Sequence, residues 1–150
     1  MMKKISAVAI CCVVTACSSG EKTELRTNRV DFPSTARIIV WLWGYDNQVA
    51  DLSASLIRSY DEPANQWPIL LEIPDEPHRL IDQGLGNVPQ ERASFYFSVY
   101  VDLNGDGKLC PGDLRQQVDD LPFYKGAPPA TIDAIFTPIE TGNACMATTP

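Results

Sequence analysis

Alternation of apolar and polar residues is the clearest periodic signal along this chain. In the segment FYFSVYV, the side chains of Phe95, Phe97, Val99 and Val101 fall on one face and the intervening residues on the other, as in a strand with one buried face. The runs RIIVWLW (37–43), WPILLEIP (67–74) and TIDAIFTPI (131–139) have strand length and are flanked by turn-forming residues. These four segments predict a mainly β domain.

The segment VADLSASLIRSY (49–60) does not alternate in this way. Leu52, Leu56 and Ile57 are spaced as on one face of a helix, so this segment favours a short helix over a strand. The short strands and the twelve prolines of the chain still favour an antiparallel β-sandwich over a helical bundle.

The N-terminal residues have a different pattern. A basic start, MMKK, precedes an uncharged apolar run over 5–14, which is shorter than the ~20 residues needed to span a bilayer. The following Val14-Thr15-Ala16-Cys17 resembles a bacterial lipobox. That resemblance implies that residues 1–16 are a lipoprotein signal peptide and that Cys17 becomes the lipidated N-terminus. An ordinary secretory signal that contains a cysteine is the alternative.

The residues after Cys17 predict where the protein is anchored and where its domain begins. By the enteric sorting rule an aspartate at position 18 would indicate the inner membrane, and Ser18 therefore favours the outer membrane, with the protein facing the periplasm. Residues 17–35 contain the lipidated cysteine and a polar stretch without a clear period, which predicts a flexible tether. We expect residues 36–150 to form one sandwich domain.

Removal of the signal peptide changes the cysteine count. Of five cysteines, Cys11 and Cys12 leave with the signal peptide and Cys17 carries lipid, which leaves Cys110 and Cys145. In an oxidising compartment these two are expected to form a disulfide, the alternative being two free thiols.

The charge of the mature chain limits its partners. Signal-peptide removal deletes two of twelve basic residues and no acidic one, so ten basic and nineteen acidic residues give a formal charge of −9. Such a surface repels phosphate backbones, and we expect no nucleic-acid partner.

Residues 102–113, DLNGDGKLCPGD, carry the strongest candidate for a metal site. They follow the D-x-N-x-D-G-x5-acid spacing of an EF-hand-type calcium loop, in which oxygen ligands alternate around the ion and glycine permits a sharp bend. An aspartate at the last position resembles dockerin and extracellular calcium loops. The predicted ligands of a structural calcium ion are Asp102, Asn104, Asp106, the Lys108 carbonyl and Asp113.

The same segment has a second interpretation. Asn104-Gly105 is a strong signal for a two-residue type I′ hairpin, and the preceding segment is a predicted strand, whereas an EF-hand has a helix there. On this interpretation Asp102 and Asp106 are solvated acids of a turn.

The middle of the chain resembles a known family. Across about residues 36–109, GYDNQVADLSASLI followed by WPILLEIPDEPHRLID is similar to the YbaY/YscW family of small bacterial lipoproteins. Gln48 and Ser53 replace the usual Ser and Pro, and Leu70-Leu71 replaces a Phe-centred pattern. The resemblance implies an immunoglobulin-like β-sandwich on a lipid anchor, without enzymatic residues, and some relatives escort secretin subunits to the outer membrane. The matching residues are Asp46, Ala50, Asp51, Ala54, Pro68, Ile69, Pro77, Ile81 and Asp82.

Candidates for catalysis are few. His78 is the only histidine and lies in the polar stretch DEPHRL, so we expect a surface role for it and no enzymatic activity. Trp41, Trp43 and Tyr45 line one face of the first predicted strand. Such a row packs in a core, stacks sugars or docks a protein segment.

Two functions follow from these observations. The first is a non-enzymatic outer-membrane lipoprotein that binds or escorts a periplasmic or outer-membrane protein. The second is a lipid-anchored carbohydrate-binding protein or hydrolase.

Overall fold

The computed structural model describes residues 21–29, 31–49, 53–82, 87–117, 124–140, 142 and 144–149. Within them the chain is mainly β, as predicted, with two short 3-10 helices, η1 (Pro77–Leu80) and η2 (Gln90–Arg92). The strands are β1 (Lys22–Thr27), β2 (Arg37–Asp46), β3 (Ser55–Pro63), β4 (Ile69–Glu72), β5 (Ala93–Asp102), β6 (Lys108–Leu109), β7 (Leu114–Gln116), β8 (Tyr124–Lys125), β9 (Thr131–Ala134), β10 (Phe136–Pro138) and β11 (Met146–Ala147).

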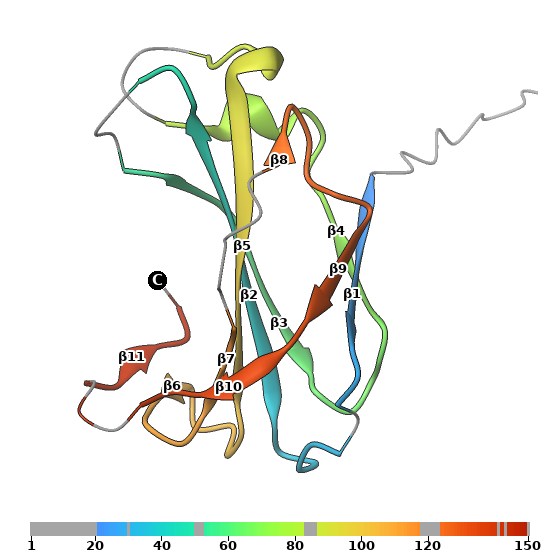
Figure 1. Cartoon of the computed structure of the whole chain (residues 1–150), viewed down its shortest axis with the longest axis vertical. Coiled ribbons are helices and arrows are strands. Elements are labelled where there is room, and N and C mark those ends of the chain that lie inside the picture. Colours follow the sequence, from blue (N-terminus) through green and yellow to red (C-terminus); the bar gives the residue numbers. More distant parts are fainter. Residues whose placement is uncertain are drawn as a thin grey trace, which may run out of the picture.

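Two sheets enclose the core (Figure 1). One has the strand order β4-β1-β9, and the other has the order β10-β7-β5-β2-β3, with β8 also paired to β5. Strands β6 and β11 form a separate two-stranded sheet. The paired strands are antiparallel except β1 and β9, which are parallel. The predicted β-sandwich class is confirmed.

Strands β2 and β5 form the centre of the larger sheet. They pair over ten residues, from Arg37 opposite Asp102 to Asp46 opposite Ala93. The alternation seen in the sequence is realised, since the apolar side chains of β5 point into the core. The opposing sheet completes the core with Leu25, Ile69, Leu71, Ile132 and Ala134.

The short helix expected within 49–60 is wrong for the described part of that segment, which contributes to β3. The register of β2 against β3 shifts between Leu42 and Trp43, and Ile57 is the extra residue in β3. A bulge of this kind inserts one residue into one strand and breaks the period of two. The bulge therefore explains why the apolar residues around Ile57 do not alternate and why their spacing resembled one face of a helix.

The folded domain begins earlier than expected. Residues 22–27, assigned to the tether over 17–35, form β1, which pairs with β4 on one side and β9 on the other. Leu25 is fully buried, and the Thr23 hydroxyl donates a 2.6 Å hydrogen bond to the Pro129 carbonyl. The strand was missed because KTELRT has a single apolar residue, Leu25.

The sandwich has two ends, which lie about 30 Å apart because β2 spans ten residues at roughly 3.3 Å each. At the Glu21 end, the Ile73 N–H donates to the Glu21 carbonyl at 2.9 Å. A depression of about 400 Å³ there is lined by residues that include Glu21, Gln90 and Gly126. Figure 1 shows this end at the top, where β1 begins.

The opposite end carries the loop of residues 102–113. The Thr35 hydroxyl donates to the Leu103 carbonyl at 3.3 Å, and the Ala64 N–H donates to the Ala36 carbonyl at 3.0 Å. The first bond ties the loop to the turn that precedes β2, and the second joins that turn to the turn that follows β3. We call this the 102–113 end.

Candidate functional site

The 102–113 segment connects β5 to β7. Val101 of β5 pairs with Leu114 of β7, so the residues that follow and precede them, Asp102 and Asp113, meet at the base of the loop. Both side chains are buried, with 1 % and 6 % exposure. The first and last predicted calcium ligands are therefore neighbours in the fold.

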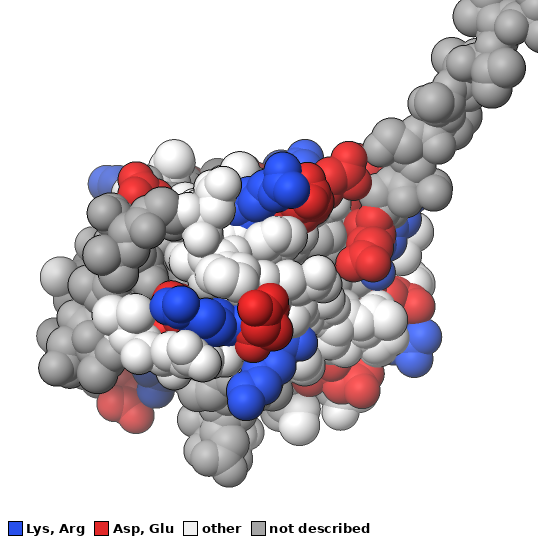
Figure 2. Space-filling model, turned by 90° about the horizontal axis from the view of Figure 1, so that it is seen from above, with Lys and Arg blue, Asp and Glu red and all other residues white. Residues whose placement is uncertain are grey.

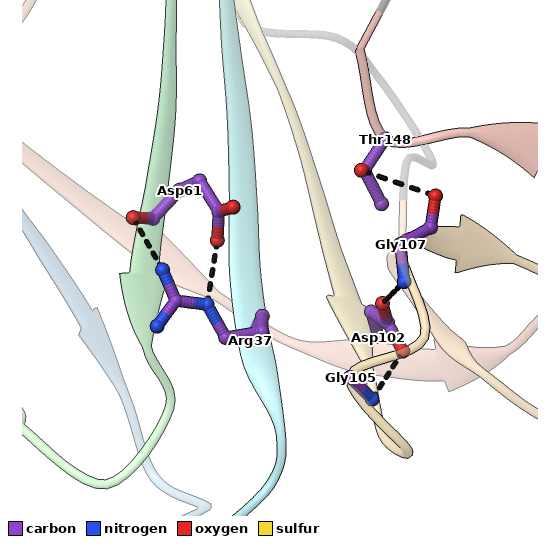
Figure 3. A network of polar contacts seen from close by, with 6 residues as sticks. All are labelled: Arg37, Asp61, Asp102, Gly105, Gly107 and Thr148. Carbon is purple, nitrogen blue, oxygen red and sulfur yellow. Dashed lines mark hydrogen bonds and ion pairs between the residues drawn. The ribbon is translucent and has the colours of Figure 1, made fainter.

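Backbone N–H groups surround both of these carboxylates. The two oxygens of Asp102 accept hydrogen bonds from the N–H groups of Gly105 (2.7 Å) and Gly107 (2.9 Å) (Figure 3). The two oxygens of Asp113 accept from Leu103 (2.9 Å) and Cys110 (2.7 Å). This network explains how two acidic side chains are buried at the base of the loop, because hydrogen bonds to a charged acceptor offset its desolvation.

The middle of the loop is exposed. The Asn104 side-chain oxygen accepts from the Asp106 N–H, and Asp106 Oδ1 accepts from the Lys108 N–H, both at 2.9 Å. Across the described residues, no group of three or more Asp, Glu, His or Cys side chains is close enough to hold a metal ion. The five predicted ligands share one loop, and calcium binding stays a prediction.

The hairpin interpretation of this loop is wrong. Strand β6 pairs with β11 and not with β5, so no two-residue hairpin forms at Asn104-Gly105. Gly105 has a φ of 71°, and a Cβ atom there would collide with the Thr35 carbonyl oxygen. Close packing of the loop against the turn before β2 thus requires glycine at this position.

The predicted disulfide is confirmed. Cys110 and Cys145 are bonded, with their Cα atoms 4.3 Å apart, and the bond joins the loop to the C-terminal segment. Beyond it, the N–H and hydroxyl groups of Thr148 each lie 3.2 Å from the Gly107 carbonyl (Figure 3). The Thr148 carbonyl accepts a 3.3 Å hydrogen bond from the Trp41 indole. The C-terminal segment therefore covers part of the larger sheet.

The predicted aromatic row lies on the outer face of that sheet. Trp41 is 7 % exposed and packs with Ile39, Leu109 and Ile139, so it belongs to a second hydrophobic cluster. Trp43 and Tyr45 are partly exposed. Trp41 is therefore buried, but in this outer cluster and not in the sandwich core between the two sheets.

Strand β5 adds two members that the sequence argument missed. Tyr96 stacks on Trp43 with ring centroids 6.3 Å apart and an interplanar angle of 16°, and Tyr100 lies 5.0 Å from Trp41. Burial raises the pKa of both tyrosines, so their hydroxyls stay neutral. The alternation of residues 95–101 placed both tyrosines on the polar face, and their proximity to Trp41 and Trp43 depends on the pairing of β2 with β5.

An ion pair between a buried aspartate and a half-buried arginine lies at the Glu21 end. The Arg92 guanidinium donates from two nitrogens to the two oxygens of Asp46, which is 3 % exposed. Hydrogen bonding to Arg92 holds the pKa of Asp46 below its usual range, although burial alone would raise it. The pair ties the end of β2 to η2.

The remaining sequence candidate, His78, lies on η1 and is partly exposed. It shares the depression at the Glu21 end with Asp75 and Glu76. Among the described residues no helix is long and apolar enough to cross a membrane.

Comparisons of the chain with known protein families, with curated proteins and with solved structures give no match. The resemblance to the YbaY/YscW family therefore remains a prediction from the residues quoted above.

Proposed function

We propose that this protein is a non-enzymatic lipoprotein, held in the outer membrane by lipid on Cys17, whose periplasm-facing sandwich binds or escorts a protein partner. The observation that carries the proposal is the disulfide. After processing at Cys17, Cys110 and Cys145 are the two cysteines left, and they are joined. Disulfides are typical of exported proteins, so this bond and the N-terminal sequence support the same compartment.

Acylation of Cys17 is the first test. Cells that express the wild-type chain are labelled with radioactive palmitate and fractionated, beside cells that express Cys17→Ser and Cys145→Ser. The wild type is expected to carry label and enter the outer-membrane fraction, and Cys17→Ser to lose both properties. Cys145→Ser breaks the disulfide and keeps the lipid site, so it controls for general misfolding. Label on Cys17→Ser, or an unlabelled wild type, contradicts the anchor.

We assign the partner face to the outer side of β2 and β5, formed by Trp43, Tyr45 and Tyr96. These rings are partly exposed, while neighbouring Trp41 is already covered. The Trp43 indole N–H is buried and has no hydrogen-bond acceptor among the described residues. Tyrosine and tryptophan are enriched in protein interfaces, and the partly exposed rings of this face fit that composition.

The partner face is tested by crosslinking and co-purification from membranes. A stoichiometric protein partner is expected with the wild type and should be lost in Trp43→Ser/Tyr96→Ser. Leu70→Ser is the matched control, because Leu70 is 58 % exposed and lies on β4 of the other sheet. Equal loss of the co-purified partner in both variants would mean that the partner does not bind through Trp43 and Tyr96.

A carbohydrate-binding module, or a lipid-anchored hydrolase, is the second candidate. The near-parallel Trp43 and Tyr96 rings favour it, since sugars stack on flat aromatic surfaces. Titration with a soluble oligosaccharide should then quench tryptophan fluorescence, and Trp43→Ser should abolish that change. A protein escort predicts no such response.

We also propose that the 102–113 loop binds calcium as a structural ion. Asp102 and Asp113 offer roughly eight lone pairs between them, and the four backbone N–H bonds occupy four of these. At ten times a Kd near 1 mM, binding would stabilise the fold by about 1.4 kcal/mol.

The calcium proposal is tested by calorimetry and thermal unfolding with calcium and with chelator. Asp106→Ala is the informative variant, because Asp106 is exposed and its loss leaves the buried base of the loop intact. Saturable heat in the wild type that Asp106→Ala removes supports the site. Absence of heat at several-millimolar calcium means that the loop is held by its own hydrogen bonds.

A further inference from the structure

The chain between the expected lipid and the folded domain is very short. Strand β1 begins at Lys22, and the carbonyl of the preceding residue, Glu21, accepts a 2.9 Å hydrogen bond from the Ile73 N–H. Cys17 and Glu21 are four residues apart in the sequence. A chain of that length reaches no more than about 14 Å even when fully extended, so the lipid fixes the neighbourhood of Glu21 close to the bilayer.

This limit distinguishes the two ends of the sandwich. Glu21 lies at one end with Pro74, Gln90 and Gly126, which line the same depression. The 102–113 end is about 30 Å away along β2. The reach of the four-residue link is therefore about half the length of the domain. The link can hold the Glu21 end at the bilayer, but it is too short to let the 102–113 end take the same position.

The surface at the Glu21 end suits a position beside lipid headgroups. Figure 2 looks onto this end and shows basic and acidic side chains interspersed around an uncharged area. Exposed Lys22 and Lys125 lie here, and Arg79 is paired with Glu76 at 2.9 Å. With both signs interleaved, attraction and repulsion by lipid phosphates offset each other, and the length of the link decides the orientation.

We infer that the Glu21 end faces the membrane and that the 102–113 loop, the disulfide and the C-terminal segment point away from it into the aqueous space. This inference rests on the lipid anchor at Cys17 proposed above. The partner it specifies is the headgroup surface of the anchoring bilayer, reached by the residues around Glu21.

The test measures the depth of two sites in the lipidated protein. Because Cys17 is acylated and Cys110 is bonded to Cys145, a single introduced cysteine is the free thiol available to a fluorophore. Gln90→Cys labels the Glu21 end and Asp106→Cys the 102–113 end; both positions are exposed. Each labelled protein is reconstituted into phosphatidylethanolamine/phosphatidylglycerol vesicles with and without a nitroxide attached to the headgroup.

Headgroup quenching is expected to be several-fold stronger at Gln90→Cys than at Asp106→Cys. Equal quenching, or stronger quenching at Asp106→Cys, overturns the orientation. The measurements are made in chelator, so that the loss of a proposed calcium ligand at Asp106 has no effect on stability. Unchanged melting temperatures of both labelled variants under this condition ensure that folded domains are compared.

A longer link tests the cause of the orientation. Insertion of about fifteen Gly/Ser residues after Ser19 raises the maximum reach of the link to about 65 Å, which exceeds the length of the domain, so the two quenching values should converge. A difference that survives the insertion would show that surface contacts, and not the link, set the orientation.

Flotation of the vesicles separates this inference from the proposed function. Protein that does not float with the vesicles contradicts the lipid anchor itself. Protein that floats while both labels are quenched equally contradicts the orientation alone.

Discussion

The two hydrophobic clusters of this domain are held in different ways. Among the residues that the structure describes, the main cluster contains twenty buried ones, including Phe95, and lies between the two sheets. The outer cluster contains four, Ile39, Trp41, Leu109 and Ile139, on the outer face of the larger sheet. Its cover is formed by β6 and β11, which have two residues each.

The difference shows what each cluster depends on. The main cluster is enclosed by long ladders such as the ten-residue pairing of β2 with β5, and hydrophobic burial suffices to hold it. A pair of two-residue strands is not stable by itself in water. The outer cluster therefore needs the Cys110–Cys145 bond and the contacts of Thr148 to keep its cover in place.

The largest effect is expected from truncation in the main cluster. Phe95 is fully buried, and Phe95→Ala should destabilise the domain by about 3–5 kcal/mol through lost burial and a cavity. Urea unfolding measures the change, and Phe95→Leu, which keeps most of the volume, should cost clearly less. Equal, small costs for the two variants would mean that the inner face of β5 is not the stabilising centre.

Removal of the disulfide should come next. Cys110→Ser/Cys145→Ser opens a link over 35 residues and should cost about 2–4 kcal/mol. The damage should be local, with faster amide exchange in β6 and β11 and a red-shifted tryptophan emission, because Trp41 loses its cover. Amide exchange in the centres of β2 and β5 serves as the internal control. Uniform loss of protection in all four strands would contradict the separation of the two clusters.

The base of the 102–113 loop is expected to matter more than its tip. Asp102→Ala removes the acceptor for two backbone N–H groups and should cost about 2–3 kcal/mol. Asp106→Ala, at the exposed tip, should change stability by about 0.5 kcal/mol or less in chelator. Thermal unfolding of both variants in chelator makes the comparison without metal. A larger cost for Asp106→Ala would mean that the tip organises the loop.

The sequence predicted the parts of this fold that depend on local pattern. Residues 95–101 alternate and form the centre of β5, and the spacing of Asp102 and Asp113 identified a loop whose ends meet. The cysteine count identified the pair that is bonded.

The errors occurred where structure depends on distant residues. Strand β1 has one apolar side chain and forms because β4 and β9 flank it. The bulge at Ile57 is defined only by the partner strand. Trp41 is buried outside the sandwich core, where it contacts a C-terminal segment more than a hundred residues away, and no local period encodes this contact.

A smaller cost than that of Asp102→Ala is expected from the loss of a single hydrogen bond inside the main cluster. The Tyr60 hydroxyl of β3 donates a 2.8 Å hydrogen bond to the Glu72 carbonyl of β4, and thereby joins the two sheets. Tyr60→Phe should cost about 1 kcal/mol at neutral pH. Burial raises the pKa of Tyr60 to about 12, above the value near 10 of an unfolded chain.

This shift predicts how the cost depends on pH. Since the folded state favours the neutral hydroxyl, its stabilising contribution is complete below about pH 10 and is lost as the pH rises toward 12. The difference in unfolding free energy between wild type and Tyr60→Phe should therefore shrink between pH 10 and 12. The other tyrosines are common to both proteins, so the difference isolates Tyr60. A constant difference across that range would mean that Tyr60 titrates like an exposed side chain and that the main cluster is open to water at β3.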